Sequence, residues 1–456
     1  MLVTVTAQGA RMNTNGQAVA SFIAAAGDRP LPPHVLDAAR LCLADWMSVA
    51  IGAAGEPAGR IVRETVAQWN SNGRASLLFG GTSAAPFAAL ANGTLAHCLD
   101  FDDTYVDAVT HTSAPVWAAT LALGEETEAS EAAMLSAFVT GFEVAARVGH
   151  GLGQAVTARG WHGTGVFGRI GAAAAAATLL KLDAGRALHA VALAATQTSG
   201  LTASFGTMAK PFHAGKAAMD GILSAQLAAG GFTGATGMLE PGGGLDNAVI
   251  QDGFPAITPI EFSDWRILRN SFKSYAACHL IHPSIDAARS LLADGLDLGA
   301  VRSVRADVGA LAVKVTGLGD GKPATPLAGK FDLRYCVALA LHGRDVSAAD
   351  FRDPWALEPA IAVTASKVAV HDHPDMGFAS ATMAIETGAG IVAAYIPVAK
   401  GHPGNPMSWD DMDRKFDGLV VPALPNHARV MFGLLRRFGD GGVLPGIQGI
   451  IGALRG

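Results

Sequence analysis

The sequence has little charge and no long apolar run. Only 16% of its 456 residues are Asp, Glu, Lys or Arg, although 50% are hydrophobic and the mean hydropathy is +0.31. A membrane-spanning helix needs about 20 consecutive apolar residues, and candidates such as 171–180 are shorter and rich in alanine. The first 16 residues lack the basic start and apolar stretch of a signal peptide. We therefore expect a cytoplasmic protein with a large buried core and no membrane contact.

Cysteines and clustered basic residues are also scarce. The four cysteines are scattered and form no CxxC pair, which argues against a zinc ribbon or an iron–sulfur centre and fits a reducing compartment. Lys and Arg number 33 against 39 Asp and Glu, with no basic run, so nucleic-acid binding is not expected. HExxH, GxSxG, P-loop and kinase signatures are absent from the sequence as well.

Helical periodicity dominates the first half of the chain. Apolar residues recur at spacings of three and four over residues 32–53. The same pattern predicts further helices over 83–99, 113–126, 131–148, 171–180 and 187–197. Alanine dominates their apolar faces, so we expect closely packed helices. The 55 glycines, nearly twice the usual share, suggest tight loops near a ligand.

The pattern changes after about residue 264. Valine-rich, partly alternating text predicts strands over 301–315, 361–370 and 381–398, with helices at 331–342 and 347–351 between them. Helical patterns then resume at 409–420 and 425–438. Strands separated by helices after an all-helical half indicate a second, α+β domain. We expect a mainly α protein with a large all-helical domain (16–263), a smaller inserted α+β domain (264–400), and C-terminal helices that rejoin the first domain (401–456).

The segment from His97 to His111 concentrates polar residues after an apolar helix. Asp100, Thr104 and His111 fall at the helix end and in the following loop. Its three closely spaced aspartates repel one another unless cations, helix N-termini or a ligand relieve them. The alternative is an ordinary helix end in which one aspartate caps the next helix. Spacing alone leaves both interpretations open.

A glycine-rich segment, 160–165, precedes an alanine-rich helix. Free backbone N–H groups at a helix N-terminus form a site for an anion. His162 within it is a candidate acid or base, because its ordinary pKa lies near neutrality. The alternative is a plain glycine-rich helix start.

Lysines and histidines also cluster in 206–216. Lys210, His213 and Lys216 fall in a stretch bounded by Gly and Pro, which we expect to be a loop. Lysine ammonium groups suit a substrate carboxylate. A solvated basic loop is the alternative, although the interleaved apolar residues argue against it.

A further cluster in 273–282 precedes a helix expected at 283–292. Lys273, Tyr275, His279 and His282 lie here beside the expected domain boundary, where clefts tend to form. An ordinary interdomain connection is an equal alternative. Tyr335 is another candidate, although a single tyrosine on a helix is more often packed.

Together these lysines and histidines favour proton transfer on an anionic substrate without a cofactor. A cation beside the substrate carboxylate would stabilise the enolate-like charge that develops when the neighbouring proton leaves.

Four stretches of the chain resemble the MmgE/PrpD family, namely HCLDFDDTYVDAVTHTSAP, GWHGTGVFGRIGAAAAAATLLKLD, GTMAKPFHAGKAAMDGILSAQLAAGGFTG and KSYAACHLIHPSIDA. The resemblance covers nearly the whole chain after residue 18. It implies a large helical domain, a smaller α+β lid and a homodimer. It also implies chemistry that needs neither a metal ion nor an organic cofactor.

The resemblance also assigns residues. It implies catalytic roles for His111, His162, Lys210, Lys273 and Tyr335. It implies substrate binding by Asp100, Thr104, Lys210 and Lys273, and we add His282 from the 273–282 cluster as a further substrate-binding candidate. Which histidine is the base stays open.

The expected activity is that of a lyase, most simply a dehydratase, acting on a small di- or tricarboxylate such as a citrate-like acid. The alternatives are a cis-aconitate-type decarboxylase, an iminodisuccinate-type epimerase, and a carboxylate-binding helical scaffold without activity. The Ala-Ala-Cys-His text after Tyr275 differs from the form typical of 2-methylcitrate dehydratases.

Overall fold

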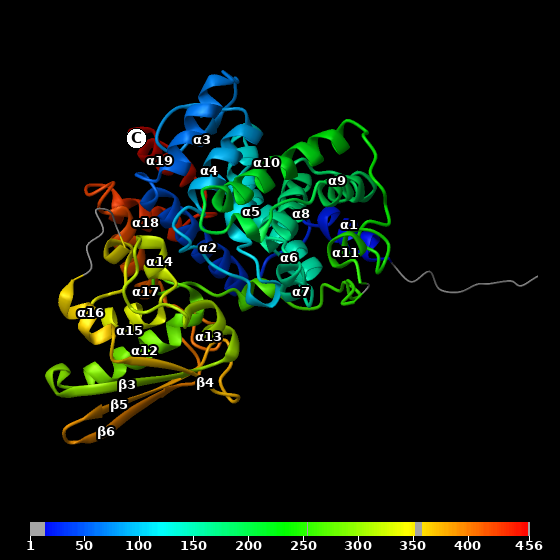
Figure 1. The fold of residues 1–456 in the computed structure, drawn as a ribbon. Helices are drawn as coiled ribbons and strands as arrows, with labels where there is room; N and C mark the ends of the chain where they lie inside the picture. The colour runs from blue at the N-terminus through cyan, green and yellow to red at the C-terminus, as the bar shows by residue number, and fades with distance from the viewer. Residues whose placement is uncertain (1–13, 253, 352–357, 455–456) are drawn as a thin grey trace, which may run out of the picture.

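Helices dominate the computed structural model, which describes residues 14–252, 254–351 and 358–454 (Figure 1). The first are α1 (Asn15–Ala24), α2 (Pro33–Gly52), α3 (Pro57–Gln68), α4 (Ala85–Leu95), α5 (Ser113–Glu126) and α6 (Glu131–Gly149). They are followed by α7 (Gly153–Ala158), α8 (Gly163–Leu179), α9 (Ala184–Thr196), α10 (Ala209–Ala229) and α11 (Leu245–Ile250). A short hairpin, β1 (Ala75–Ser76) and β2 (Thr82–Ser83), lies between α3 and α4. The helical first half predicted from periodicity is confirmed.

Helix α8 lies at the centre of this part and packs against α5, α6, α9 and α10. It begins at Gly163, well before the predicted start at Gly171. Glycine is required at several positions because the neighbouring helices approach so closely that an added side chain would clash with them. A Cβ at Gly171 would lie 2.7 Å from the carbonyl oxygen of Gly141 on α6, and one at Gly221 would lie 2.5 Å from Ala172 Cβ. Small residues therefore set the spacing of this core.

Helix α6 is long and apolar enough to cross a membrane by length and composition alone. However, 83% of the relevant window is buried inside the protein, as in a core helix. Its Phe138 stacks on Trp117 of α5 with ring centroids 4.1 Å apart. The hydrophobicity of this helix is thus used for internal packing.

A four-stranded sheet with the order β4-β3-β5-β6 follows in the chain. Strand β3 (Val301–Val308) pairs in parallel with β4 (Val368–Asp372) and antiparallel with β5 (Ala381–Thr387), which pairs with β6 (Gly390–Ile396). Helices α12 (His282–Ala293) and α15 (Leu333–Leu341) contact the sheet and lie between it and the helical part in Figure 1. The shorter helices are α13 (Ala310–Thr316), α14 (Pro326–Lys330) and α16 (Pro359–Ala365). We call residues 282–400 the sheet-bearing segment.

Two of the predicted strands were partly wrong. Only the first half of 301–315 is a strand, because the chain turns at Gly309 into α13. Residues 359–365 form α16, with a proline in the first turn, where its missing N–H costs nothing. The predicted strand 381–398 is a hairpin of two strands.

The C-terminal helices return to the helical part. They are α17 (Trp409–Val420), α18 (Ala428–Arg436) and α19 (Leu444–Ala453), and α17 and α18 pack on α2. The indole of Trp409 donates to Asp37 Oδ1 at 3.0 Å. Lys415 of α17 is buried, and its Nζ donates to Asp45 Oδ1 of α2 at 2.5 Å. Helices α17 and α18 thus share a core with α2.

Candidate active site

The loop after α4 is held in an unusual conformation. Asp100 has a φ of +53°, a left-handed conformation that is uncommon outside glycine and is often found at functional sites. Buried side chains hold this loop through hydrogen bonds to its backbone. Asp45 Oδ2 accepts the backbone N–H of Asp103 at 2.9 Å, and Lys415 Nζ donates to the carbonyl of Phe101 at 2.7 Å. The loop is therefore anchored by α2 and α17 together.

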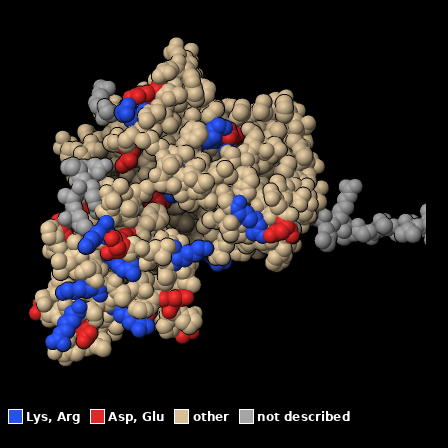
Figure 2. Space-filling model, in the orientation of Figure 1, with Lys and Arg blue, Asp and Glu red and all other residues tan. Residues whose placement is uncertain are grey.

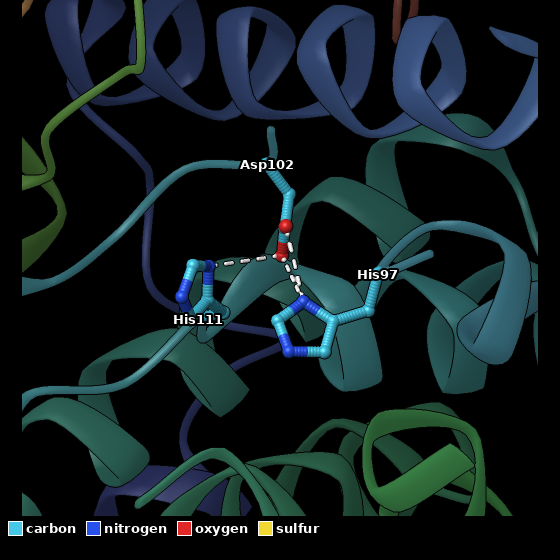
Figure 3. Close-up of side chains that lie close together, drawn as sticks. All are labelled: His97, Asp102 and His111. Carbon is cyan, nitrogen blue, oxygen red and sulfur yellow. Dashed lines mark hydrogen bonds and ion pairs between the residues drawn. The ribbon is translucent and has the colours of Figure 1, made fainter. Parts of the chain in front are cut away.

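The Asp102 carboxylate lies between two histidine rings (Figure 3). Its oxygens are 2.9 and 3.0 Å from His97 Nδ1, and Oδ2 is 3.1 Å from His111 Nδ1. Burial alone would raise the pKa of Asp102, but the two imidazoles hold that pKa well below its usual range. Asp102 is thus a charged acceptor that orients both rings.

His97 is buried, and burial lowers its pKa to about 4 although Asp102 opposes the shift. The ring is therefore neutral at pH 7. When its Nδ1–H donates to Asp102, Nε2 carries a free lone pair. Nε2 is buried and has no hydrogen-bond partner among the described residues, so it is poised to accept a proton or hydrogen bond from a ligand.

Lysines from separate elements converge on Leu99 and Asp100. Lys210, in the first turn of α10, donates to Asp100 Oδ1 at 2.5 Å. Lys273 donates to the carbonyl oxygen of Asp100 at 2.6 Å and lies 3.3 Å from Oδ1. Lys330 donates to the carbonyl oxygen of Leu99 at 3.0 Å. Burial would raise the pKa of Asp100, but Lys210 and Lys273 hold it well below its usual range.

His162 is the N-cap residue of α8, as its place before the alanine-rich helix suggests. Its Nδ1 is 3.0 Å from Nδ1 of His213 on α10, so one ring donates and the other accepts. The ring also stacks on His97, with centroids 5.6 Å apart. Burial lowers the pKa of His162 well below its ordinary value, and the neighbouring histidines and Lys210 act in the same direction. The ring is neutral at pH 7.

The structure brings five predicted residues into one cluster: Asp100, His111, His162, Lys210 and Lys273. Their roles stay predictions. Lys210 lies on a helix, whereas the sequence suggested a loop. Helical spacing places Lys210 and His213 on the same face of α10.

Thr104 and His282 border this cluster. The backbone of Thr104 pairs with Ser271, two residues before Lys273, and its Oγ1 is buried with no hydrogen-bond partner among the described residues. His282 packs on His279 with ring centroids 4.7 Å apart. Burial and the nearby charge of Lys273 lower the pKa of His282 to about 3.

Tyr335 lies on α15 within the sheet-bearing segment. Its ring packs edge-on against Phe351 with centroids 6.1 Å apart, and its N–H donates to Asp332 Oδ1 at 3.1 Å. Burial raises its pKa, and the charge of Asp350 acts in the same direction. The proposed catalytic role of Tyr335 stays a prediction.

Sequence reasoning did not single out several residues of the cluster: His97, Asp102, His213 as a partner of His162, and Lys330. His97 and Asp102 stand inside a motif that was recognised, and their spacing of five residues across a helix end was the available signal. Lys330 had no local signal, since it is 231 residues from its partner Leu99.

His97, Asp102 and His111 also form a candidate metal site, since their ligand atoms lie within 4.8 Å of one another. Two imidazoles and a carboxylate suit zinc and similar ions. However, separations of 2.9–3.1 Å between nitrogen and oxygen are those of hydrogen bonds. A metal ion held by Asp102 and by Nδ1 of both rings would replace the Nδ1 protons, whereas the present geometry fits a carboxylate that orients two rings.

The surface drawn in Figure 2 is hollowed where the sheet-bearing segment meets the helical part, and basic side chains border the hollow. The helical part shows few charged side chains on this face, whereas the sheet-bearing segment shows many. The charged side chains on this face are therefore unevenly distributed.

Comparisons with known proteins give consistent matches. The MmgE/PrpD N-terminal domain matches residues 17–256, and the MmgE/PrpD C-terminal domain matches residues 275–436. A cis-aconitate decarboxylase of Aspergillus terreus is 26% identical over 334 residues, which are 68% of each chain. The cis-aconitate decarboxylase of Homo sapiens is 33% identical over 213 residues, 45% of this chain and 44% of the relative. That of Mus musculus is 31% identical over 212 residues, 45% and 43% of the two chains.

Proposed function

Because the chain belongs to the MmgE/PrpD family, whose matched relatives are enzymes, we propose that it is a lyase acting on a small di- or tricarboxylate. One observation carries the proposal. Lys210 and Lys273 converge on Asp100 directly beside the histidines that Asp102 orients. Cations that hold carboxylates thus stand next to groups that move protons.

We propose that the lysines bind substrate carboxylates and that a histidine transfers the proton at carbon. The ammonium groups stabilise the negative charge that spreads from the reacting carbon onto a carboxylate in the transition state. His162 and His97 are neutral at pH 7 and can accept a proton. His111, nearest to Asp100 among the histidines, is the candidate that carries a proton to the substrate.

Two reactions fit these groups. In decarboxylation of a cis-aconitate-like acid, the C–C bond breaks, CO₂ leaves, and a protonated histidine delivers a proton to the carbon that keeps the electron pair. In dehydration of a citrate-like acid, a histidine removes the proton next to a carboxylate, and the hydroxyl leaves as water with a second proton. The names of the relatives support decarboxylation, which we place first. Dehydration, the reaction expected from the sequence, is the alternative.

We further propose that the reaction needs no metal or organic cofactor, and that the protein is a cytoplasmic homodimer. All four cysteines are free, which supports a reducing compartment. Elemental analysis, activity after chelation, and light scattering for the mass in solution test these points.

Proton NMR in D₂O tests the proposed function directly. Purified protein is incubated with citrate, 2-methylcitrate, cis-aconitate and iminodisuccinate in turn. Loss of a carbon identifies a decarboxylase, loss of water a dehydratase, and deuterium gain without either an epimerase. No turnover on the whole panel, combined with tight tricarboxylate binding by calorimetry, would point to a scaffold without activity.

The acid that the protein turns over in this panel is then used as the substrate to test the histidines. His111→Ala and His162→Ala should each lower kcat by about 10²–10⁴-fold, the usual contribution of a general acid or base. His34→Ala on the exposed first turn of α2 is the matched control and should leave kcat unchanged. Near-native turnover in both site variants would refute the assignment.

A further inference from the structure

Lys330 joins the sheet-bearing segment to the site. It is the last residue of α14, and its Nζ donates to the carbonyl of Leu99 at 3.0 Å. Its own carbonyl accepts the N–H of Cys278 at 2.8 Å, in the segment that also carries Lys273. The backbone of Lys330 is thus bonded to the segment that carries Lys273, and its side chain reaches the loop after α4.

The ammonium groups of three lysines contact the same two residues, Leu99 and Asp100. Lys210, Lys273 and Lys330 come from three separate elements and all bind the stretch Leu99–Asp100. The carboxylates that act on Lys330 are those of Asp100 and Glu56. Asp100 is the carboxylate that pairs with both Lys210 and Lys273, so three ammonium groups share few anionic partners in a largely buried place, where a further anion would be stabilised.

Lys330 has hydrogen-bonding capacity left for such an anion. An ammonium group has three N–H donors, and the acceptor described for Lys330 Nζ is one neutral carbonyl oxygen. Burial lowers the pKa of Lys330, Asp100 and Glu56 raise it, and Lys273 and Lys210 lower it. The side chain therefore belongs electrostatically to the site, although it comes from a different part of the chain.

We propose that Lys330 binds a carboxylate of the substrate and makes the site selective for acids with a third carboxylate. This inference rests on the proposed function, because it assumes that the lysine cluster is where a polycarboxylate binds. Lys210 and Lys273 hold two carboxylates, and Lys330 holds the additional one. Substrate selection is then shared between the helical part and the sheet-bearing segment.

A matched pair of ligands tests the selectivity by isothermal titration calorimetry. Tricarballylate and glutarate differ only by the central carboxylate of tricarballylate. The wild-type protein should bind tricarballylate at least about tenfold more tightly than glutarate. Lys330→Met should weaken tricarballylate binding by about 10–100-fold, the range for a hydrogen bond to a charged group, and should leave glutarate binding within about threefold. Lys330→Arg should retain most of the preference, since it keeps the charge.

Lys322→Met is the control, because Lys322 is an exposed lysine shortly before α14 in the same segment. It should change neither affinity. Equal loss of both ligands in Lys330→Met would overturn the inference, as would a wild-type protein without preference for tricarballylate, a result that needs no variant. Turnover in the NMR panel is read separately. Lys330-dependent selectivity without turnover would refute the proposed function alone, and turnover without such selectivity would refute this inference alone.

Discussion

At the scale of single residues, Asp102 contacts two histidines of the cluster at once. Its carboxylate accepts from Nδ1 of His97 and lies 3.1 Å from Nδ1 of His111. A ring whose Nδ1 carries the proton presents an unprotonated Nε2 when it is neutral. One buried charge thus selects the tautomer of two histidines at once, in the way that a neighbouring carboxylate orients a catalytic imidazole.

Asp102→Asn should therefore lower kcat by about 10²-fold or more, with little change in KM. The amide is neutral and can offer an N–H to Nδ1, which reverses the tautomer, whereas the lysines that bind carboxylates are untouched. Steady-state kinetics and ¹⁵N NMR of the imidazole nitrogens measure both effects. Asp107→Asn in the same loop region, whose carboxylate pairs with Arg269 at 2.7 Å, is the control. An unchanged tautomer with an unchanged kcat would rule out the positioning role.

At the scale of helices, the crossing of α4 and α10 positions Lys210 and His213. A Cβ at Gly215 on α10 would overlap the carbonyl oxygen of Leu90 and the hydroxyl of Thr94 on α4. Gly215→Ala should lower the free energy of unfolding by about 1–3 kcal/mol, as overpacking does, and should reduce kcat/KM because α10 shifts.

Urea denaturation and kinetics on the same preparation measure these effects. Gly418→Ala on α17 is the matched control, since no heavy atom lies within 4 Å of its added Cβ. It should raise stability by about 0.5–1 kcal/mol through helix propensity alone. If Gly215→Ala behaved like Gly418→Ala, close packing between α4 and α10 would not determine the position of the site.

The helices also show which parts of the structure were predictable from sequence. Residues 113–126 and 409–420 have the predicted bounds because their apolar spacing and ends are local properties. Residues 310–316 form a helix although valine favours strands, so local strand propensity does not determine their structure. Within the site, the recognised motifs contained most of the clustered residues. Lys330 and Lys415 could not be predicted, since their partners lie 231 and 370 residues away.

At the scale of the whole molecule, charged residues are few, and several of the ionisable side chains are buried. Burial lowers the pKa of His97 to about 4 and that of His282 to about 3, and it holds those of His162 and His279 well below the ordinary value. Burial also acts on carboxyls, and with Asp45 beside it the pKa of Asp103 rises to about 7. The folded state therefore disfavours protonation of these four histidines and favours protonation of Asp103.

The histidines and this carboxyl affect stability in opposite directions. A histidine with a pKa near 6.5 when unfolded binds a proton on acidification that its buried form does not. The unfolded state then holds more protons, so the histidine contribution to stability falls as the pH falls from about 6.5 towards the folded pKa. Asp103 stays protonated in the folded state while its unfolded form loses the proton above about pH 4, so its contribution rises as the pH falls from about 7.

A comparison of variants isolates the histidine contribution from that of the carboxyls. For His282, with a pKa of about 3 when folded, the stability lost between pH 7 and pH 5 is about 2 kcal/mol. His282→Gln should lower the free energy of unfolding at pH 7 through lost packing, but this deficit should shrink by about 2 kcal/mol at pH 5, because glutamine takes up no proton in either state. Urea denaturation at the two pH values measures the change, and His34→Gln at an exposed position should show none. A deficit that is the same at both pH values would mean that His282 titrates normally in the folded protein, and that buried neutral histidines do not set its acid stability.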